Sequence, residues 1–308
     1  MAQKEVKGRI ASVKNIQKIT RAMEMVAAAR LRKAEQRIEE LRPYASAIRR
    51  MTRQAAEAAQ GIPRLPILAP RETEQTVGIL LFTGDRGLAG AFNSQIVRAG
   101  IRAGADYRAQ GKKVRYYAAG RRGVSSLRFR NQEPAGAYEG FTDRPTYADA
   151  RAIAAELMVA YVDGDVDRVE VFYNRYVSPL VQVVTRETLL PLNQASIMED
   201  GEGADAGQAA AGAGQAVSHN GHRALTEYEP DPADILERLV PSYVEISIFR
   251  SLLESTSSEH GARMTAMRNA SENAGELIKD LTLQANRERQ AAITQEIMEV
   301  VSGAESLV

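Results

Sequence analysis

The stretch that decides the fold is residues 242–302, "SYVEISIFRSLLESTSSEHGARMTAMRNASENAGELIKDLTLQANRERQAAITQEIMEVVS". It contains no proline, and its apolar residues recur at the three- and four-residue steps of a helix. These residues are Ala274, Ile278, Leu281 and Ala285, followed by Ile293, Ile297 and Val300. A helix of about sixty residues is about 90 Å long, which is more than a globular domain needs. Because such a helix must bury its apolar stripe, the pattern predicts a partner helix and a coiled coil.

The N-terminal segment is predicted to be that partner, in an antiparallel pair. Its apolar stripe runs through Val6, Ile10, Val13, Ile16, Ile19, Met23 and Val26, then Ala34, Ile38, Leu41, Ala45 and Ile48. Pro43 predicts a kink, whereas Gly61 and the three prolines of "GIPRLPILAP" predict the end of the helix. Residues 1–60 carry 14 basic and 6 acidic side chains, and residues 242–308 carry 6 basic and 10 acidic ones. The opposite charges favour pairing of the two segments.

Between the two helices the pattern changes to that of a small α/β domain. Strand-like runs occupy 76–82, 113–119, 168–176 and 179–190, and helical runs at 93–110 and 146–162 separate the first three. This order predicts a mostly parallel, Rossmann-like sheet, finished by a strand that pairs across the "YVSP" turn. Residues 196–222 are rich in Gly and Ala, with four acids and no Lys or Arg, and predict a flexible insert. We therefore expect a helix over 1–61, the α/β domain over 76–192, the insert over 193–228 and the second helix over 233–308.

The turn "TGDRGLAGAF" (residues 83–92) follows a strand and precedes a helix, as phosphate-binding turns do. It contains no lysine, its glycines have the spacing GxxGxxG rather than GxGxxG, and Asp85 would repel a phosphate. We expect the glycines to allow a tight turn with positive φ, and Asn93 or Ser94 to cap the helix that follows. The sequence therefore predicts no nucleotide site at this turn.

Composition narrows the remaining function classes. The 308 residues include no Cys, which excludes disulfides, thiolate nucleophiles and cysteine-ligated zinc. No apolar run approaches the length of about 18 residues that a membrane span needs, and "MAQKEVKGRI" lacks the apolar core of a secretion signal. His219 and His222 fall in the insert, and we interpret His260 as a residue on a helix face. No histidine is near a candidate nucleophile, so we predict no catalytic residue, no cofactor and no metal.

The two long helical stretches, together with "TGDRGLAGAFN", "YNRYVSP" and "EYEPDP", closely resemble the gamma subunit of F-type ATP synthases. The resemblance runs from the first helix to the last residues and omits only the Gly/Ala-rich insert. It implies a non-catalytic rotor shaft with an α/β foot, which couples proton flow to ATP synthesis. The implied partners are the alpha and beta subunits of the F1 sector, the epsilon subunit and the ring of c subunits. The N-terminus has no transit sequence, so we expect a bacterial protein that is peripheral on the cytoplasmic face of the inner membrane.

The resemblance also implies residue roles. Met23 matches the place where the family's shaft meets an acidic lever of a beta subunit, and Arg289, Gln290 and Thr294 match its upper contacts with beta. The turn around Arg86 and Ala89 is expected to sweep past the lower ends of the beta subunits. Tyr228 and Glu229 match the foot residues that face the c ring and the epsilon side. Chloroplast-type members carry a redox-active cysteine pair in an insert at this place, and the lack of Cys excludes thiol switching here.

Two other functions remain open from the residues alone. One is a coiled-coil adaptor whose basic N-terminal helix binds acidic partners or nucleic acid. The other is a nucleotide-dependent enzyme built on the α/β domain. The acidic C-terminal helix argues against the first, and the glycine spacing argues against the second. The insert either regulates rotation or is a passive loop, and we expect a passive loop.

Overall fold

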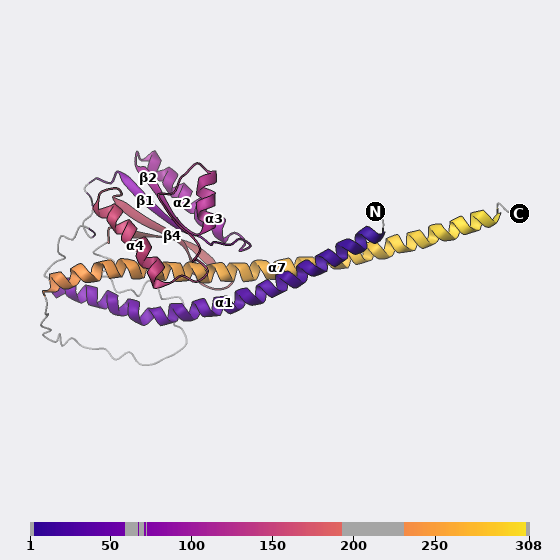
Figure 1. Cartoon of the computed structure of the whole chain (residues 1–308), viewed down its shortest axis with the longest axis horizontal. Helices are drawn as coiled ribbons and strands as arrows, with labels where there is room; N and C mark the ends of the chain where they lie inside the picture. Colours follow the sequence, from indigo (N-terminus) through magenta and orange to yellow (C-terminus); the bar gives the residue numbers. More distant parts are fainter. Residues whose placement is uncertain (1–2, 59–66, 68–70, 72, 193–230, 306–308) are drawn as a thin grey trace.

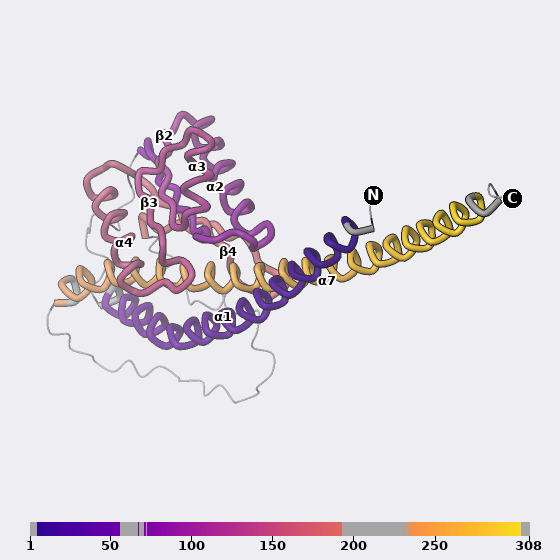
Figure 2. Tube along the Cα trace, turned by 45° about the vertical axis from the view of Figure 1, so that its right-hand side comes forward, coloured from indigo at the N-terminus to yellow at the C-terminus, as the bar shows by residue number. Residues whose placement is uncertain are grey.

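The computed structural model describes residues 3–58, 67, 71, 73–192 and 231–305. Two long helices, α1 (Gln3–Ala58) and α7 (Pro232–Glu305), run antiparallel to each other, and a compact α/β domain packs against one end of the pair (Figure 1). Helix α1 continues through Pro43, so this proline does not end it. Helix α7 extends beyond the N-terminus of α1 as a single helix, and both views show this free end (Figure 2). The prediction of a long antiparallel helical pair is confirmed.

The seam between the helices differs in part from the predicted stripe. Ile16, Ile19 and Val26 are 53%, 59% and 53% exposed, whereas Thr20 and Ala27 are buried against α7. The Thr20 hydroxyl hydrogen-bonds the Ser271 hydroxyl at 2.7 Å, and the Gln17 amide donates to the Ser271 carbonyl at 3.2 Å. Small and polar residues therefore form this part of the seam, because they let the two backbones approach, and the larger apolar residues of α1 face outward. The prediction that Ile16, Ile19 and Val26 pack in the seam was wrong.

The sheet of the α/β domain has five strands in the order β3-β2-β1-β4-β5. Strands β1 to β4 are parallel, and β5 pairs antiparallel with β4. The strands are β1 (Thr76–Phe82), β2 (Lys113–Ala119), β3 (Gly136–Tyr138), β4 (Arg168–Tyr176) and β5 (Gln182–Leu190). The domain helices are α2 (Phe92–Ala109), α3 (Arg121–Phe129) and α4 (Tyr147–Val162). The mostly parallel sheet is confirmed.

Helix α3, strand β3 and the start of strand β5 differ from the sequence-based expectation. Helix α3 and strand β3 were not predicted, because nine and three residues are too short for a clear periodic pattern. The last strand begins at Gln182 rather than at Pro179, because residues 178–181 form a turn in which the Val181 amide bonds the Ser178 carbonyl at 3.1 Å. The predicted insert, 193–228, lies outside the described residues.

The sheet has a different helix layer on each face. Along β1, Val77, Ile79 and Leu81 pack against α2 and α3, whereas Leu80 and Phe82 pack against α4 and α7. Helix α7 therefore serves two layers at once: one side covers the sheet and the other side packs along α1. This double packing buries α7 on all sides where it crosses the domain.

Candidate functional site at the junction of the helical pair and the α/β domain

A run of polar side chains lies buried where α7 crosses the domain. It spans residues 255–263, and its Ser, Thr, Glu, His and Arg side chains are all buried. The hydroxyls of Ser255, Thr256 and Ser258 donate to the carbonyls of Phe82, Thr142 and Asn174 at 3.3, 2.9 and 2.8 Å. A buried polar group is costly unless it is hydrogen-bonded, so these bonds fix the position of α7 against the ends of β1 and β4.

The same run contains an ion pair one turn apart on α7. Arg263 donates to the Glu259 carboxylate, and its guanidinium also donates to the Gly87 carbonyl at 3.3 Å. A Cβ on Gly84 would lie 2.5 Å from a carboxylate oxygen of Glu259. Burial raises the pKa of Glu259, and Arg263 opposes that shift. The glycine turn after β1 is thus pressed against a buried charge pair of α7.

This contact changes the interpretation of the glycines in "TGDRGLAGAF". Only Gly90 has a positive φ, of 55°, and the non-glycine residue Leu88 has a φ of 62°. Gly84 is needed instead because α7 approaches it closely. The Asn93 side chain does not cap α2, because its Oδ1 accepts a hydrogen bond from the Gly84 amide at 2.8 Å. Ser94 does not cap α2 either, because its hydroxyl donates to the Ala91 carbonyl at 3.0 Å. The positive-φ expectation is confirmed at Gly90 but not at Gly84 or Gly87, and the expectation that Asn93 or Ser94 caps α2 was wrong.

Asp85 organises the loops around this turn. Its carboxylate accepts hydrogen bonds from the backbone amides of Arg121, Gly140 and Thr142 and from the Thr142 hydroxyl, at 2.9 to 3.1 Å. Burial acts to raise the pKa of Asp85, but these hydrogen bonds together hold it below its usual value. Asp85, whose charge would repel a phosphate, therefore accepts a hydrogen bond at the N-terminal end of α3.

Asp143 is the point at which three other elements converge. Its carboxylate pairs with Arg30 of α1, its Oδ2 lies 3.7 Å from Arg86 Nη1, and its Oδ1 lies 3.9 Å from His260 Nε2. Burial acts to raise the pKa of Asp143, but the charges of Arg30 and Arg86 help to hold it below its usual value. Burial lowers the pKa of His260 to about 4, and Arg263 adds to this, so the imidazole is neutral at neutral pH. Its Nδ1 faces Arg263 Nη1 at 3.3 Å, which leaves Nε2 to carry the proton.

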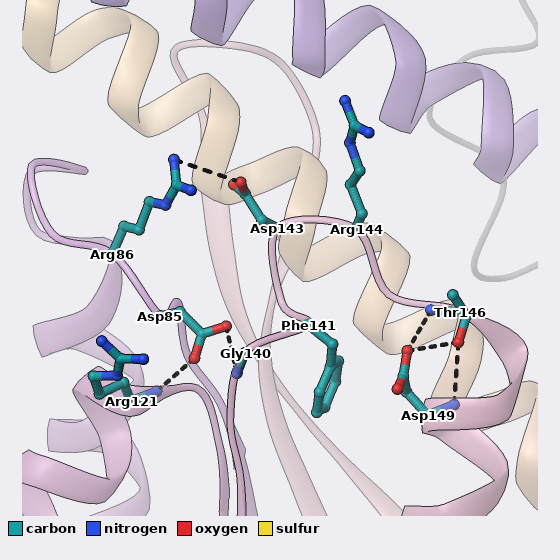
Figure 3. Close-up of a pocket in the computed structure, with 9 residues that line it drawn as sticks. All are labelled: Asp85, Arg86, Arg121, Gly140, Phe141, Asp143, Arg144, Thr146 and Asp149. Atoms are coloured by element: carbon teal, nitrogen blue, oxygen red, sulfur yellow. Dashed lines mark hydrogen bonds and ion pairs between the residues drawn. The ribbon is translucent and has the colours of Figure 1, made fainter.

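An open pocket beside this cluster has a polar lining (Figure 3). Its acidic residues are bonded within the chain: Asp149 forms a capping box with Thr146, and Asp85 and Asp143 are held as described above. The side chains of Arg86 and Arg121 are largely exposed at its rim. The Thr146 hydroxyl and the Asp149 carboxylate bond each other within the capping box, and no group of three His, Asp or Glu among the described residues could hold a metal ion.

The predicted contact residues fall in separate places. Met23 is half-buried on α1, next to Glu24, whose carboxylate accepts from Arg268 Nε at 2.9 Å. Arg86 is exposed on the turn near Arg30, about two helical turns from Met23. Ala89 is only 1% exposed and packs in the core, so its side chain offers no contact surface, whereas its neighbour Leu88 is 64% exposed. The expectation that the Ala89 side chain contacts a beta subunit is therefore corrected.

Arg289, Gln290 and Thr294 lie together on the free end of α7, where all three are exposed. The Thr294 hydroxyl donates to the Gln290 carbonyl at 2.9 Å, within the helix. They are about 30 Å along α7 from the level of Met23, since Arg268 pairs with Glu24. Tyr228 and Glu229 lie outside the described residues.

Sequence reasoning missed the residues of the junction. The run "SSEHGAR" is polar and was interpreted as part of a helix face, and "FTDRP" around Asp143 was given no role. The available signal was that a polar run interrupts the apolar periodicity of an otherwise regular helix. Separately, none of the described helices is long and apolar enough to cross a membrane.

Comparison with known proteins gives a consistent result over the whole chain. The model of the family described as ATP synthase matches residues 2–307. The ATP synthase gamma chain of Rubrobacter xylanophilus is 43% identical over 305 residues, which are 99% of this chain and 98% of that protein. The ATP synthase gamma chain of Acidiphilium cryptum is 42% identical over 309 residues, covering 99% of each.

Solved structures share the fold. A chain of the Euglena gracilis mitochondrial ATP synthase superposes with a TM-score of 0.65 at 17% identity, over 99% of this chain and 94% of that one. A chain of the Tetrahymena thermophila mitochondrial ATP synthase central stalk and c ring has a TM-score of 0.58 at 24% identity, over 82% and 99% of the two chains. At these identities the likeness concerns the arrangement of helices and sheet.

Proposed function

Since the chain belongs to the ATP synthase gamma-chain family, we propose that it is the non-catalytic rotor shaft of the complex. In this role it transmits torque between a proton-driven c ring and the catalytic beta subunits, and the nucleotide chemistry takes place on its partners. The chain supplies a rigid body of asymmetric shape. It supplies no reacting group.

The observation that carries the proposal is the continuity of α7. One helix of 74 residues packs into the α/β domain at one end and stands free at the other. A twist applied to the domain passes into the free end without crossing a loop or a domain boundary. The buried hydrogen bonds and ion pair of residues 255–263 fix the domain to that helix, so the two ends turn together.

Two sets of described residues are proposed to touch beta subunits. The upper set is Arg289, Gln290 and Thr294, which are exposed on the free end of α7. The lower set is Met23 on α1 and Arg86 on the turn after β1, with Leu88 as the exposed apolar residue of that turn. Because all these side chains are at least partly accessible, their substitution should affect coupling more than folding.

The opposite end of the chain is proposed to face the membrane-bound part of the complex. Tyr228 and Glu229 are proposed to contact the c ring and the epsilon subunit. In this arrangement the protein is held at the cytoplasmic face of a bacterial inner membrane only through its partners. This part of the proposal rests on family membership.

The test is reconstitution of the complex from purified subunits in lipid vesicles. With the wild-type chain we expect ATP hydrolysis that pumps protons, and without it neither a stable complex nor pumping. Arg289→Ala with Gln290→Ala should lower coupled pumping, whereas Arg98→Ala, on an exposed residue of α2, should not. Equal activity of alpha and beta subunits with and without this chain would refute the rotor role.

The adaptor alternative is less well supported by the geometry. Arg30, in the middle of the basic helix, is engaged by Asp143 of the α/β domain and is mostly shielded from solvent. It is therefore not free for nucleic acid. Binding of duplex DNA by the purified chain at physiological salt, with a steep salt dependence, would revive the alternative.

A further inference from the structure

Helix α1 meets the α/β domain in a different way from α7. Both apolar core clusters of the domain draw on α7, and neither contains a residue of α1 among the residues described. The apolar residues Ala45 and Ile48 of α1 pack on Ile246 of α7 instead. Helix α1 is therefore held by α7 along the seam, and polar contacts join it directly to the domain.

Three polar side-chain contacts join α1 to the domain. The Arg37 guanidinium reaches the Pro145 carbonyl at 3.5 Å, the long limit of a hydrogen bond. The Tyr176 hydroxyl donates to the Glu35 carboxylate. The third contact, between Arg30 and Asp143, joins two opposite charges that are both mostly shielded from solvent. Both partners of this contact are charged, whereas each of the other two contacts has only one charged partner, so this is the strongest of the three.

The loop that carries Asp143 is held on both sides. Thr142 bonds Asp85 through its amide and its hydroxyl, and its carbonyl accepts from Thr256 of α7 at 2.9 Å. On the other side, Thr146 caps α4. The Asp143 carboxylate thus projects from a fixed loop toward Arg30, and its other oxygen lies 3.9 Å from His260 Nε2 of α7.

We propose that Asp143 is a positioning residue that locks α1 to the α/β domain through Arg30, so that α1, α7 and the domain turn as one body. The inference rests on the proposed rotor function. When the lock is removed, α7 stays fixed to the domain, and α1 loses this direct tie to the domain and is held mainly through its seam with α7, along which it can shift under load. Part of the torque is then lost as slip, and proton pumping falls relative to ATP hydrolysis.

The test uses the reconstituted complex and measures ATP hydrolysis and proton pumping on the same vesicles. Arg30→Gln and Asp143→Asn should each lower the ratio of pumping to hydrolysis by about twofold or more, the lower end of effects of substitutions in a coupling network. Hydrolysis and the yield of complex should stay near wild type. Arg37→Gln is the matched control and should leave the ratio unchanged, since its contact is long.

A reversible covalent tie separates a lock from a merely structural contact. The chain has no cysteine, so the pair Arg30→Cys with Asp143→Cys can be joined selectively by a bis-methanethiosulfonate, with partner subunits whose cysteines have been replaced. Cross-linking should restore the ratio, and reduction should lower it again. Loss of hydrolysis on cross-linking would overturn the proposal, because the contact would then have to open in each turn. Normal ratios in Arg30→Gln would also overturn it, provided that the wild-type chain restores coupling. Failure of the wild-type chain itself would instead refute the rotor function.

Discussion

The Arg263 guanidinium donates a hydrogen bond to the Gly87 carbonyl oxygen at 3.3 Å. It thereby connects α7 to the glycine turn after β1, two segments that are 176 residues apart. The same guanidinium pairs with Glu259, and both side chains are buried. A buried cation with two oxygen partners tolerates little movement, so this bond fixes the rotation of α7 about its axis relative to the sheet.

Substitution of Arg263 by Met should destabilise the protein strongly. It leaves the Glu259 carboxylate buried without its cation, and the loss of one partner of a buried pair costs about 3–5 kcal/mol. The double variant Arg263→Met with Glu259→Gln should recover a large part of that loss, because no charge remains buried. Urea unfolding of the purified chain, followed by circular dichroism, measures both free energies.

The control for this pair is Arg268→Met. Arg268 is half exposed and pairs with Glu24 across the seam, so its removal should cost less than about 1 kcal/mol. A double variant no more stable than Arg263→Met alone would show that Arg263 acts through its contact with Gly87 rather than through Glu259.

Gly84→Ala should cost about 1–3 kcal/mol of unfolding free energy, as overpacking of a buried site does. The new methyl would lie 2.5 Å from the Glu259 carboxylate, which is held by Arg263 and has no room to move. Gly87→Ala is the matched variant in the same turn. There the methyl would meet the end of the exposed Arg122 side chain at 2.9 Å, which can swing away, so we expect a much smaller loss. Equal losses in the two variants, measured by thermal unfolding, would contradict this explanation.

His260 should make the protein less stable in mild acid. The pKa of its imidazole is about 4 in the folded chain, against 6.5 for an unperturbed histidine, so the unfolded chain binds the extra proton first. The neutral imidazole contributes stability above pH 6.5, and this contribution is lost as pH falls toward 4. The shift corresponds to about 3 kcal/mol. His260→Gln should lack this loss, so its stability relative to wild type should rise as pH falls from about 7 to about 4.

Other charged groups near His260 affect the pH dependence of stability in both the wild-type chain and the His260→Gln variant. Arg263, Asp143 and Arg30 face the imidazole, and burial raises the pKa of Glu259, whose effect on stability has the opposite sign in this range. The difference between the two unfolding curves is therefore the quantity to follow. Parallel stability curves for wild type and His260→Gln would show that the imidazole is protonated in the folded chain at no cost.

The long elements were predictable, and the junction was not. Helices α1 and α7 and four of the five strands follow from periodicity and from the placement of proline and glycine. Helix α3, strand β3 and the outward turn of Ile16 depend on tertiary packing, which a local pattern does not contain. Ala89 was expected at the surface, but Leu88 adopts a positive φ and takes the exposed position, so Ala89 points into the core. The burial of residues 255–263 required knowledge that α7 lies between two layers.

Removal of residues 290–308 should leave the folded body intact. Helix α7 extends past the N-terminus of α1 (Figure 1), and Ile293 and Ile297 near its C-terminal end are 48% and 57% exposed. Because the described side chains of this segment, residues 290–302, bury little apolar surface, its loss should shift the midpoint of thermal unfolding by less than about 2 °C. The helical signal should fall in proportion to the residues removed, and coupled pumping in the reconstituted complex should be lost. A large fall in the unfolding midpoint would mean that the free end of α7 packs on the chain itself, and that it is not held for a partner.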